Sequence, residues 1–107
     1  MAELEANNSA AGFEISAEAG TATVAVRGEL DVANIGALAA AVEPVIEREP
    51  KRLIVDCGAL RFADSSAIAL LVRWSTRVGQ IELRNPSPLL RKVITSMGLS
   101  ETLTLVP

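Results

Sequence analysis

The sequence of 107 residues contains no histidine, which limits the chemistry that it can perform. Imidazole is the usual general base beside a nucleophilic serine or cysteine, and histidine is the commonest metal ligand. Its absence excludes Ser–His and Cys–His nucleophile pairs and the usual zinc sites. The glycines form no G-x-G-x-x-G or G-x-x-x-x-G-K phosphate loop, and no titratable residues stand out as an acid–base couple. We therefore predict a protein that is not an enzyme and that needs no metal or cofactor.

Cysteine and aromatic residues are also scarce. Cys57 is the only cysteine, so an intrachain disulfide is excluded. Its position at the end of an apolar run predicts a buried, unreactive thiol, and a chain without disulfides suits a reducing cytoplasm. Because Phe13, Phe62 and Trp74 are the only aromatic residues, we expect a core made mostly of aliphatic side chains.

Long apolar runs and clusters of basic residues are missing as well. No apolar stretch approaches the roughly 20 residues that a membrane-spanning helix needs, and the N-terminus lacks the basic-then-apolar pattern of a signal peptide. The formal net charge of -3 describes an acidic surface, which repels the phosphates of nucleic acids. We predict a soluble, cytoplasmic protein with no nucleic-acid partner and no direct insertion into a membrane.

The sequence does contain a regular succession of secondary-structure patterns. Residues 1–12 are small and polar and are predicted to form a flexible N-terminal arm, followed by a single domain over residues 13–107. Residues 13–17 and 21–27 alternate apolar and polar side chains around a glycine turn, which predicts a β-hairpin. We expect the second strand to be broken by residues 28–31.

Helical periodicity follows in three places. Residues 35–46 have the first pattern, with Asp31 or Asn34 as its cap, and Pro44 inside it predicts a kink or an early end. The second pattern runs from the polar start at residues 64–66 to about residue 79. The third starts at Ser87 and Pro88, with an apolar face made of Leu89, Leu90, Val93, Ile94 and Met97, and ends at Gly98.

The remaining segments read as strands. Residues 52–57 form a continuous apolar run that is typical of a central strand buried on both faces, and residues 58–63 are expected to form a loop. Residues 80–84 and 103–106 are predicted as shorter strands. The order β-β-α-β-α-β-α-β predicts an α/β fold with a mixed, largely parallel sheet and helices packed on it.

The segment around Ser65 permits two interpretations. Asp and Ser before an apolar helix are ordinary capping residues, worth about 1 kcal/mol. The same helix start offers unpaired N–H groups and the positive end of the dipole, so a phosphate on Ser65 would be tolerated there. Such a phosphate adds about -1.5 to -2 charges beside Asp64, which could switch binding without unfolding the domain. Asp31, at the end of a neighbouring strand, could lie close by or could simply cap its own helix.

Four segments together resemble the STAS domain, and within it the bacterial anti-anti-sigma factors, or anti-sigma factor antagonists. These segments are Gly28–Asp31, Leu53–Asp56, Phe62–Ser66 and Asn85–Pro88, and the resemblance covers residues 13–106. The combination of Gly-Glu-Leu-Asp with Asp-Ser-Ser at this distance is more specific than either element alone.

The resemblance implies a phosphorylation-controlled partner switch. The unmodified antagonist would bind an anti-sigma factor that is also a serine kinase, the kinase would phosphorylate Ser65 and release it, and a PP2C-type phosphatase would reset it. Asp31, Asp64, Ser65, Ser66 and Ala67 match the positions expected to bind the partner. Because small members of this family are often monomers, the resemblance also implies a monomer.

One residue departs from the family pattern, and one different function fits the same family. Many members have glycine where this chain has Ala67, a change that the helix should tolerate but that could alter the fit of the kinase. The alternative function is a non-switching STAS subunit of a lipid-transport ABC complex, in which the same helix start would be an interface and phosphorylation irrelevant. A third alternative is a scaffold component of a large stress-signalling assembly, or a small-molecule or nucleotide sensor, although nothing in the sequence supports a ligand pocket.

Overall fold

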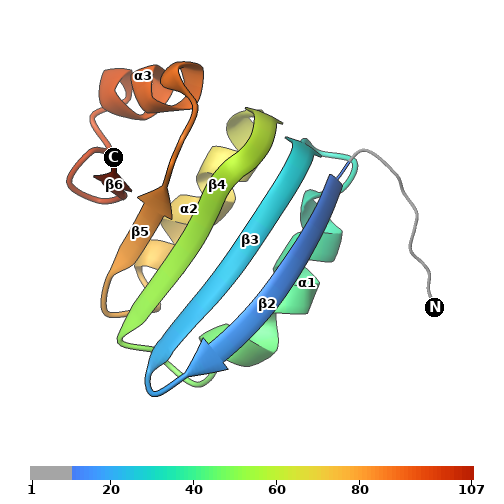
Figure 1. The fold of residues 1–107 in the computed structure, drawn as a ribbon, viewed down its shortest axis with the longest axis vertical. Helices are drawn as coiled ribbons and strands as arrows, with labels where there is room; N and C mark the ends of the chain where they lie inside the picture. Colours follow the sequence, from blue (N-terminus) through green and yellow to red (C-terminus); the bar gives the residue numbers. More distant parts are fainter. Residues whose placement is uncertain (1–10) are drawn as a thin grey trace.

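The computed structural model describes residues 11–107, which form one five-stranded sheet and three helices (Figure 1). The strands are β2 (Ala11–Glu18), β3 (Thr21–Leu30), β4 (Arg52–Ala63), β5 (Ile81–Arg84) and β6 (Thr104–Val106). Only the β2–β3 pair is antiparallel, and β3, β4, β5 and β6 follow one another in parallel. The predicted mixed, largely parallel sheet is therefore confirmed.

The helices are α1 (Ile35–Ile46), α2 (Ser65–Ser75) and α3 (Pro88–Ser96). Each one connects two neighbouring parallel strands. Because such connections are right-handed, consecutive ones along a sheet cover the same face. Figure 1 shows α1 and α2 together behind the sheet, whereas α3 lies beside the end of β4, above β5 and β6.

The core lies between the sheet and the helices α1 and α2. Alternate side chains of β3, β4 and β5 meet the buried faces of these helices. The core is mostly aliphatic, as the scarcity of aromatic residues predicts, and Trp74 is the one aromatic residue among the buried core residues that the structure describes. Its members with the smallest exposed fractions include Val24, Leu38, Val42, Leu53, Leu83 and Ile94. Burial of these side chains positions both helix starts against the ends of the strands.

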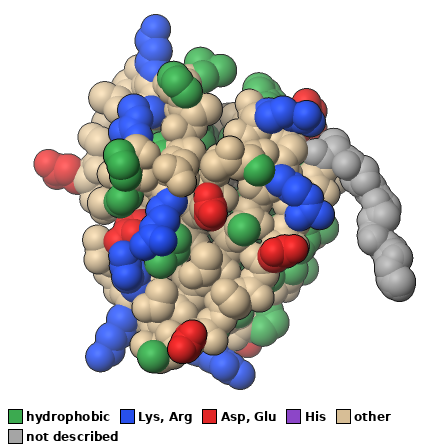
Figure 2. Space-filling model, in the orientation of Figure 1, with side chains coloured by type: hydrophobic (Ala, Val, Ile, Leu, Met, Phe, Trp, Pro, Cys, Tyr) green, Lys and Arg blue, Asp and Glu red, His purple; other side chains and the backbone are tan. Residues whose placement is uncertain are grey.

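The opposite face of the sheet carries charges of both signs, interspersed rather than gathered (Figure 2). Glu82 on β5 is the centre of one group, since its Oε2 accepts hydrogen bonds from Nε and Nη2 of Arg52 at 2.9 and 2.7 Å. Its Oε1 lies 3.6 Å from Nε of Arg84. This pairing keeps a carboxylate that is only 7% exposed from being isolated.

Two strands are longer than predicted. The expectations that residues 28–31 break β3 and that residues 58–63 form a loop are wrong, because Glu29 pairs with Phe62 and Leu30 with Ala63. The pairing register shifts between Ala25 and Arg27 and again after Gly28, so the glycine forms an irregularity inside the strand instead of ending it. The extra length carries both strands to the same edge as the starts of α1 and α2.

The N-terminal boundary also moves. Residues 1–10 of the predicted arm lie outside the described residues, but Ala11 and Gly12 belong to β2 and pair with Gly28 and Arg27. A Cβ atom at position 12 would meet the guanidinium group of Arg27, an exposed side chain that can move aside. The structured domain therefore begins earlier than residue 13.

Pro44 lies inside α1 without stopping it. The helix continues to Ile46, whose side chain is only 1% exposed, and Val42 in the same turn is fully buried. Packing of these side chains against the sheet offsets the hydrogen bond that proline cannot donate. Within residues 11–107, no helix has the length and apolar character needed to cross a bilayer.

Candidate functional site

The candidate site lies where β3 and β4 end beside each other. Leu30 pairs with Ala63 at the last position of both strands, and the backbone N–H of Asp64 donates to the Leu30 carbonyl at 3.0 Å. The next residues along the two strands therefore enter neighbouring loops, one leading to α1 and the other to α2. The expected proximity of the Asp31 loop to the start of α2 follows from this register.

Asp64 is the N-cap of α2 and connects the two loops. Its Oδ1 accepts hydrogen bonds from the backbone N–H groups of Ser66 and Ala67 at 2.9 and 3.1 Å, and from the Ser66 hydroxyl at 2.5 Å. Its Oδ2 accepts from the backbone N–H of Val32 at 3.1 Å. The Ser66 hydroxyl most strongly, and then these backbone N–H groups, hold the pKa of Asp64 below its usual value. Asp64 is therefore a fixed negative charge at neutral pH.

Ser65 is the first residue of α2, and its environment differs from that of its neighbour. Ser65 is exposed, and no hydrogen bond within residues 11–107 holds its hydroxyl group. Ser66 is partly buried, and its hydroxyl donates to Asp64. Of these two adjacent hydroxyl groups, Ser65 is the one that can be reached from solvent without breaking a capping interaction.

Asp31 contributes to the site through its loop. Its Oδ1 accepts a hydrogen bond from the backbone N–H of Ala33 at 2.9 Å, and its carbonyl accepts from Asn34 and Ile35. Asn34 occupies the N-cap position of α1, but its side chain makes no capping bond and instead accepts from the N–H of Asp31 and donates to the Glu29 carbonyl. Both residues therefore shape the loop that Asp64 holds through Val32.

The family model described as "Mlab, STAS domain" matches residues 13–107. This chain belongs to the STAS domain family. The anti-sigma-F factor antagonist RsfB of Mycobacterium tuberculosis is 29% identical to it over 89 residues, which span 80% of this chain and 73% of the relative.

Solved structures resemble this STAS domain closely. An anti-sigma factor antagonist from Mycobacterium paratuberculosis superimposes with a TM-score of 0.81 at 26% identity, covering 91% of this chain and 86% of that one. The antagonist SpoIIAA in its unphosphorylated form gives a TM-score of 0.76 at 25% identity, covering 90% of this chain and 89% of that one. The phosphorylated form of the Bacillus protein SpoIIAA gives 0.71, also at 25% identity, with coverages of 90% and 92%.

Ala67, which was expected to help bind a partner, lies in the core of this STAS domain. Its side chain is 1% exposed, because the third residue of α2 turns toward the sheet. The prediction that its methyl group changes the surface seen by a kinase is therefore wrong. Ser65 is exposed, and Asp31, Asp64 and Ser66 are partly exposed.

The sequence interpretation missed a group of exposed apolar side chains next to the site. Phe62 precedes Asp64 by two residues and is 49% exposed, while Leu89 and Val93 on α3 are 62% and 37% exposed. The available signal was the pattern of α3, in which Leu89, Val93 and Met97 form one i, i+4 row and Leu90 and Ile94 another. Only the second row is buried, because the end of the sheet covers one side of this helix.

Other chemistry is limited in the described residues. Cys57 is 2% exposed, and burial, with a smaller contribution from Asp56, raises the pKa of its thiol to about 12. It is a packing residue, as predicted from its place in the strand. Within residues 11–107, no three His, Cys, Asp or Glu side chains come together in a way that could hold a metal ion.

Proposed function

We propose that this STAS domain is an anti-sigma factor antagonist that binds an anti-sigma factor and dissociates from it when Ser65 is phosphorylated. The observation that carries the proposal is the exposed hydroxyl of Ser65 at the first position of α2, beside the fixed negative charge of Asp64. The names of the relatives support the partner class, because RsfB and the solved neighbours are antagonists of anti-sigma factors.

The arrangement of the two serines supports Ser65 as the modified residue. The hydroxyl of Ser66 is bound to Asp64, so a kinase would have to break a charge-assisted hydrogen bond to reach it. Ser65 has no such bond to lose. Phosphoryl transfer from ATP would join the γ-phosphorus to the Ser65 oxygen, pass the hydroxyl proton to the kinase and release ADP.

The physics of the helix start supports a switch that leaves the fold intact. A phosphate at the first turn of α2 would face unpaired N–H groups and the positive end of the helix dipole, which stabilise anions. At the same time it adds about -1.5 to -2 charges next to an ionised carboxylate. The relative SpoIIAA is known in both forms, and both superimpose well on this chain.

The proposal includes the enzymes that act on the switch. The anti-sigma factor is itself the serine kinase, and a PP2C-type phosphatase hydrolyses the phosphoserine to restore binding. We place the domain in the cytoplasm as a monomer, since sigma factors act there and one exposed site per chain is enough for one partner. Asp31 and Asp64 contribute by shaping and charging the surface around Ser65.

The proposal is tested with purified protein, ATP labelled on the γ-phosphate and the serine-kinase anti-sigma factors of the same organism. We expect one of them to label the wild-type chain and the Ser66→Ala variant, and to leave Ser65→Ala unlabelled while still binding it. Mapping the label by mass spectrometry identifies the residue. Labelling of Ser65→Ala at the wild-type rate, or binding by no anti-sigma factor, would contradict the proposal.

The alternative, a non-switching subunit of a lipid-transport ABC complex, makes a different prediction for the same surface. Such a subunit would co-purify with a membrane ATPase, and its affinity for that ATPase would not depend on whether Ser65 is modified. Affinity purification of the wild-type chain and of Ser65→Ala from the native organism therefore separates the two functions.

A further inference from the structure

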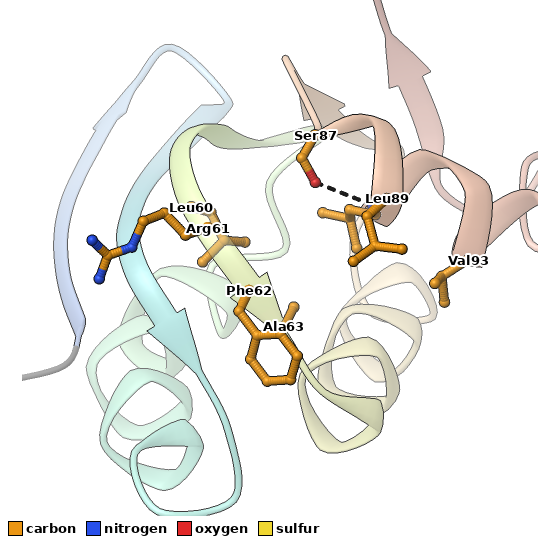
Figure 3. A pocket seen from close by; sticks show the side chains of 8 residues that line it. Leu60, Arg61, Phe62, Ala63, Ser87, Leu89 and Val93 are labelled. Carbon is orange, nitrogen blue, oxygen red and sulfur yellow. Dashed lines mark hydrogen bonds between the residues drawn. The ribbon is translucent and has the colours of Figure 1, made fainter.

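A small groove lies between the end of β4 and the start of α3, next to the Ser65 site. It has a volume of about 120 Å³ and is lined mainly by apolar side chains. Figure 3 shows Phe62 projecting from β4 and Leu89 and Val93 lying across from it on α3, while Arg61 points away from α3. Ser87, whose hydroxyl accepts a hydrogen bond from the N–H of Leu90 at 3.1 Å, forms one end.

The exposed large apolar side chains of the described residues concentrate around this groove. Three of them, Phe62, Leu89 and Val93, line it. Val32, which is 78% exposed, lies on the other side of the site, where its N–H binds Asp64. Hydrophobic side chains also protrude over α3 in the upper left of Figure 2. Single exposed apolar residues are ordinary on a protein surface, whereas apolar side chains that share one groove form a candidate interaction site.

The size of the groove indicates the class of occupant. Pockets for drug-sized molecules and cofactors usually measure about 300–1,000 Å³, several times more than this one. A groove of this size with apolar walls accommodates a single side chain. Anchoring side chains that fill such pockets supply most of the binding energy at protein interfaces.

We infer that this groove anchors one apolar side chain of the anti-sigma factor, with the surface of that partner continuing over Ser65 to Val32. The inference rests on the proposed function and adds the surface through which it operates. Continuity supports this occupant, because Phe62 is three residues before Ser65 and the apolar side chains flank the phosphorylation site on two sides.

The apolar surroundings also give phosphorylation a way to release the partner. When an apolar interface closes, it removes water from every group that it covers. The Ser65 hydroxyl tolerates this, whereas a phosphate with about two negative charges would lose its hydration against Phe62 and Val32 and would face Asp64. The groove therefore contributes to the affinity for the partner, and phosphorylation of Ser65 lowers that affinity.

The test measures binding of the unphosphorylated chain to the anti-sigma factors of its own organism by calorimetry. The variants are Phe62→Gln and Leu89→Gln in the groove, with Met97→Gln as the matched control, since Met97 is 54% exposed on the turn that ends α3 but does not line the groove. We expect each groove variant to bind at least roughly tenfold more weakly and the control to stay within about twofold of wild type. Melting curves of all variants, whose altered side chains are exposed, verify that they fold.

The possible results separate this inference from the proposed function. Wild-type affinity in Phe62→Gln and Leu89→Gln, together with weak binding by Ser65→Glu, would contradict the role of the groove in binding and would support the proposed switch at Ser65. If no anti-sigma factor binds the wild-type chain, the proposed function and the inference both fail. A wild-type dimer in sedimentation that Leu89→Gln dissociates, without any change in partner affinity, would assign the groove to a second copy of the chain and overturn the inference.

Discussion

The starts of α2 and α3 both need a cap for their first backbone N–H groups, but a serine has a different role in each. At α3 the hydroxyl of Ser87 is itself the cap, accepting from the N–H of Leu90, and proline occupies the first helical position. At α2 the carboxylate of Asp64 is the cap, and the first helical position is Ser65. Both helix starts satisfy their backbone donors, but only α2 keeps a serine hydroxyl free.

This difference teaches what a modifiable serine needs beyond a place at a helix start. Modifying Ser87 would alter the oxygen that caps α3 and therefore disturb the hydrogen bond from the N–H of Leu90. Modifying Ser65 would leave every hydrogen bond of Asp64 in place. Because Asp64 is the cap, the structural role at this helix start is separate from the regulatory role that we propose for Ser65.

The largest expected effect tests the charge at Ser65 directly. We expect Ser65→Glu to bind the anti-sigma factor about tenfold or more weakly, because an unpaired interfacial charge is costly, while its melting temperature stays near that of wild type. The neutral variant Ser65→Gln has the same length and should retain most of the affinity. Equal losses in both variants, measured by calorimetry, would make size rather than charge the cause of release.

A second effect compares the two caps by their contributions to stability. Ser87→Ala should lower the free energy of unfolding by about 1 kcal/mol, the usual loss for a serine cap. Asp64→Ala should cost more, because it removes the anchor of Val32 on the neighbouring loop as well as the bonds to α2. Urea denaturation of both variants measures the difference. A smaller loss for Asp64→Ala than for Ser87→Ala would show that its link between the loops contributes little.

Most of the fold follows from local patterns in the sequence. The caps at Asp64 and Ser87, the proline after Ser87 and the glycine at position 98, which has a φ of +74°, are short-range signals that predict helix ends well. The ends of β3 and β4 could not be predicted in this way. Gly28 is a turn residue by itself, and only pairing with a strand about 30 residues away keeps it inside a strand.

The site shows the same division. Because parallel strands bring the loops at their carboxyl ends together, the sequence predicts that Asp31 could lie near Asp64 and Ser65. Their assignment to a partner-binding site comes from the family resemblance, since capping explains the same residues. The burial of Ala67 and the exposure of Leu89 depend on which side of each helix the sheet covers. Packing between elements determines which side is covered, so the sequence alone does not predict the apolar groove.

The smallest expected effect concerns pH and again separates the two caps. The folded-state pKa of Asp64 is depressed, so its stabilising contribution is present above the unfolded value of about 3.9 and is lost as the pH falls through the folded-state pKa. Asparagine caps helices about as well as aspartate but does not titrate there. Asp64→Asn should therefore destabilise the domain less than Asp64→Ala at pH 7, and its stability should fall less than that of wild type between about pH 5 and pH 2.

Ser87→Ala should keep the acid dependence of wild type, because the hydroxyl at α3 carries no charge. Chemical denaturation at a series of pH values measures all three curves. Parallel curves for wild type and Asp64→Asn would mean that the negative charge of Asp64 does not contribute to the stability of the domain. Electrostatics would then not explain why Asp64 is the cap and Ser65 is free.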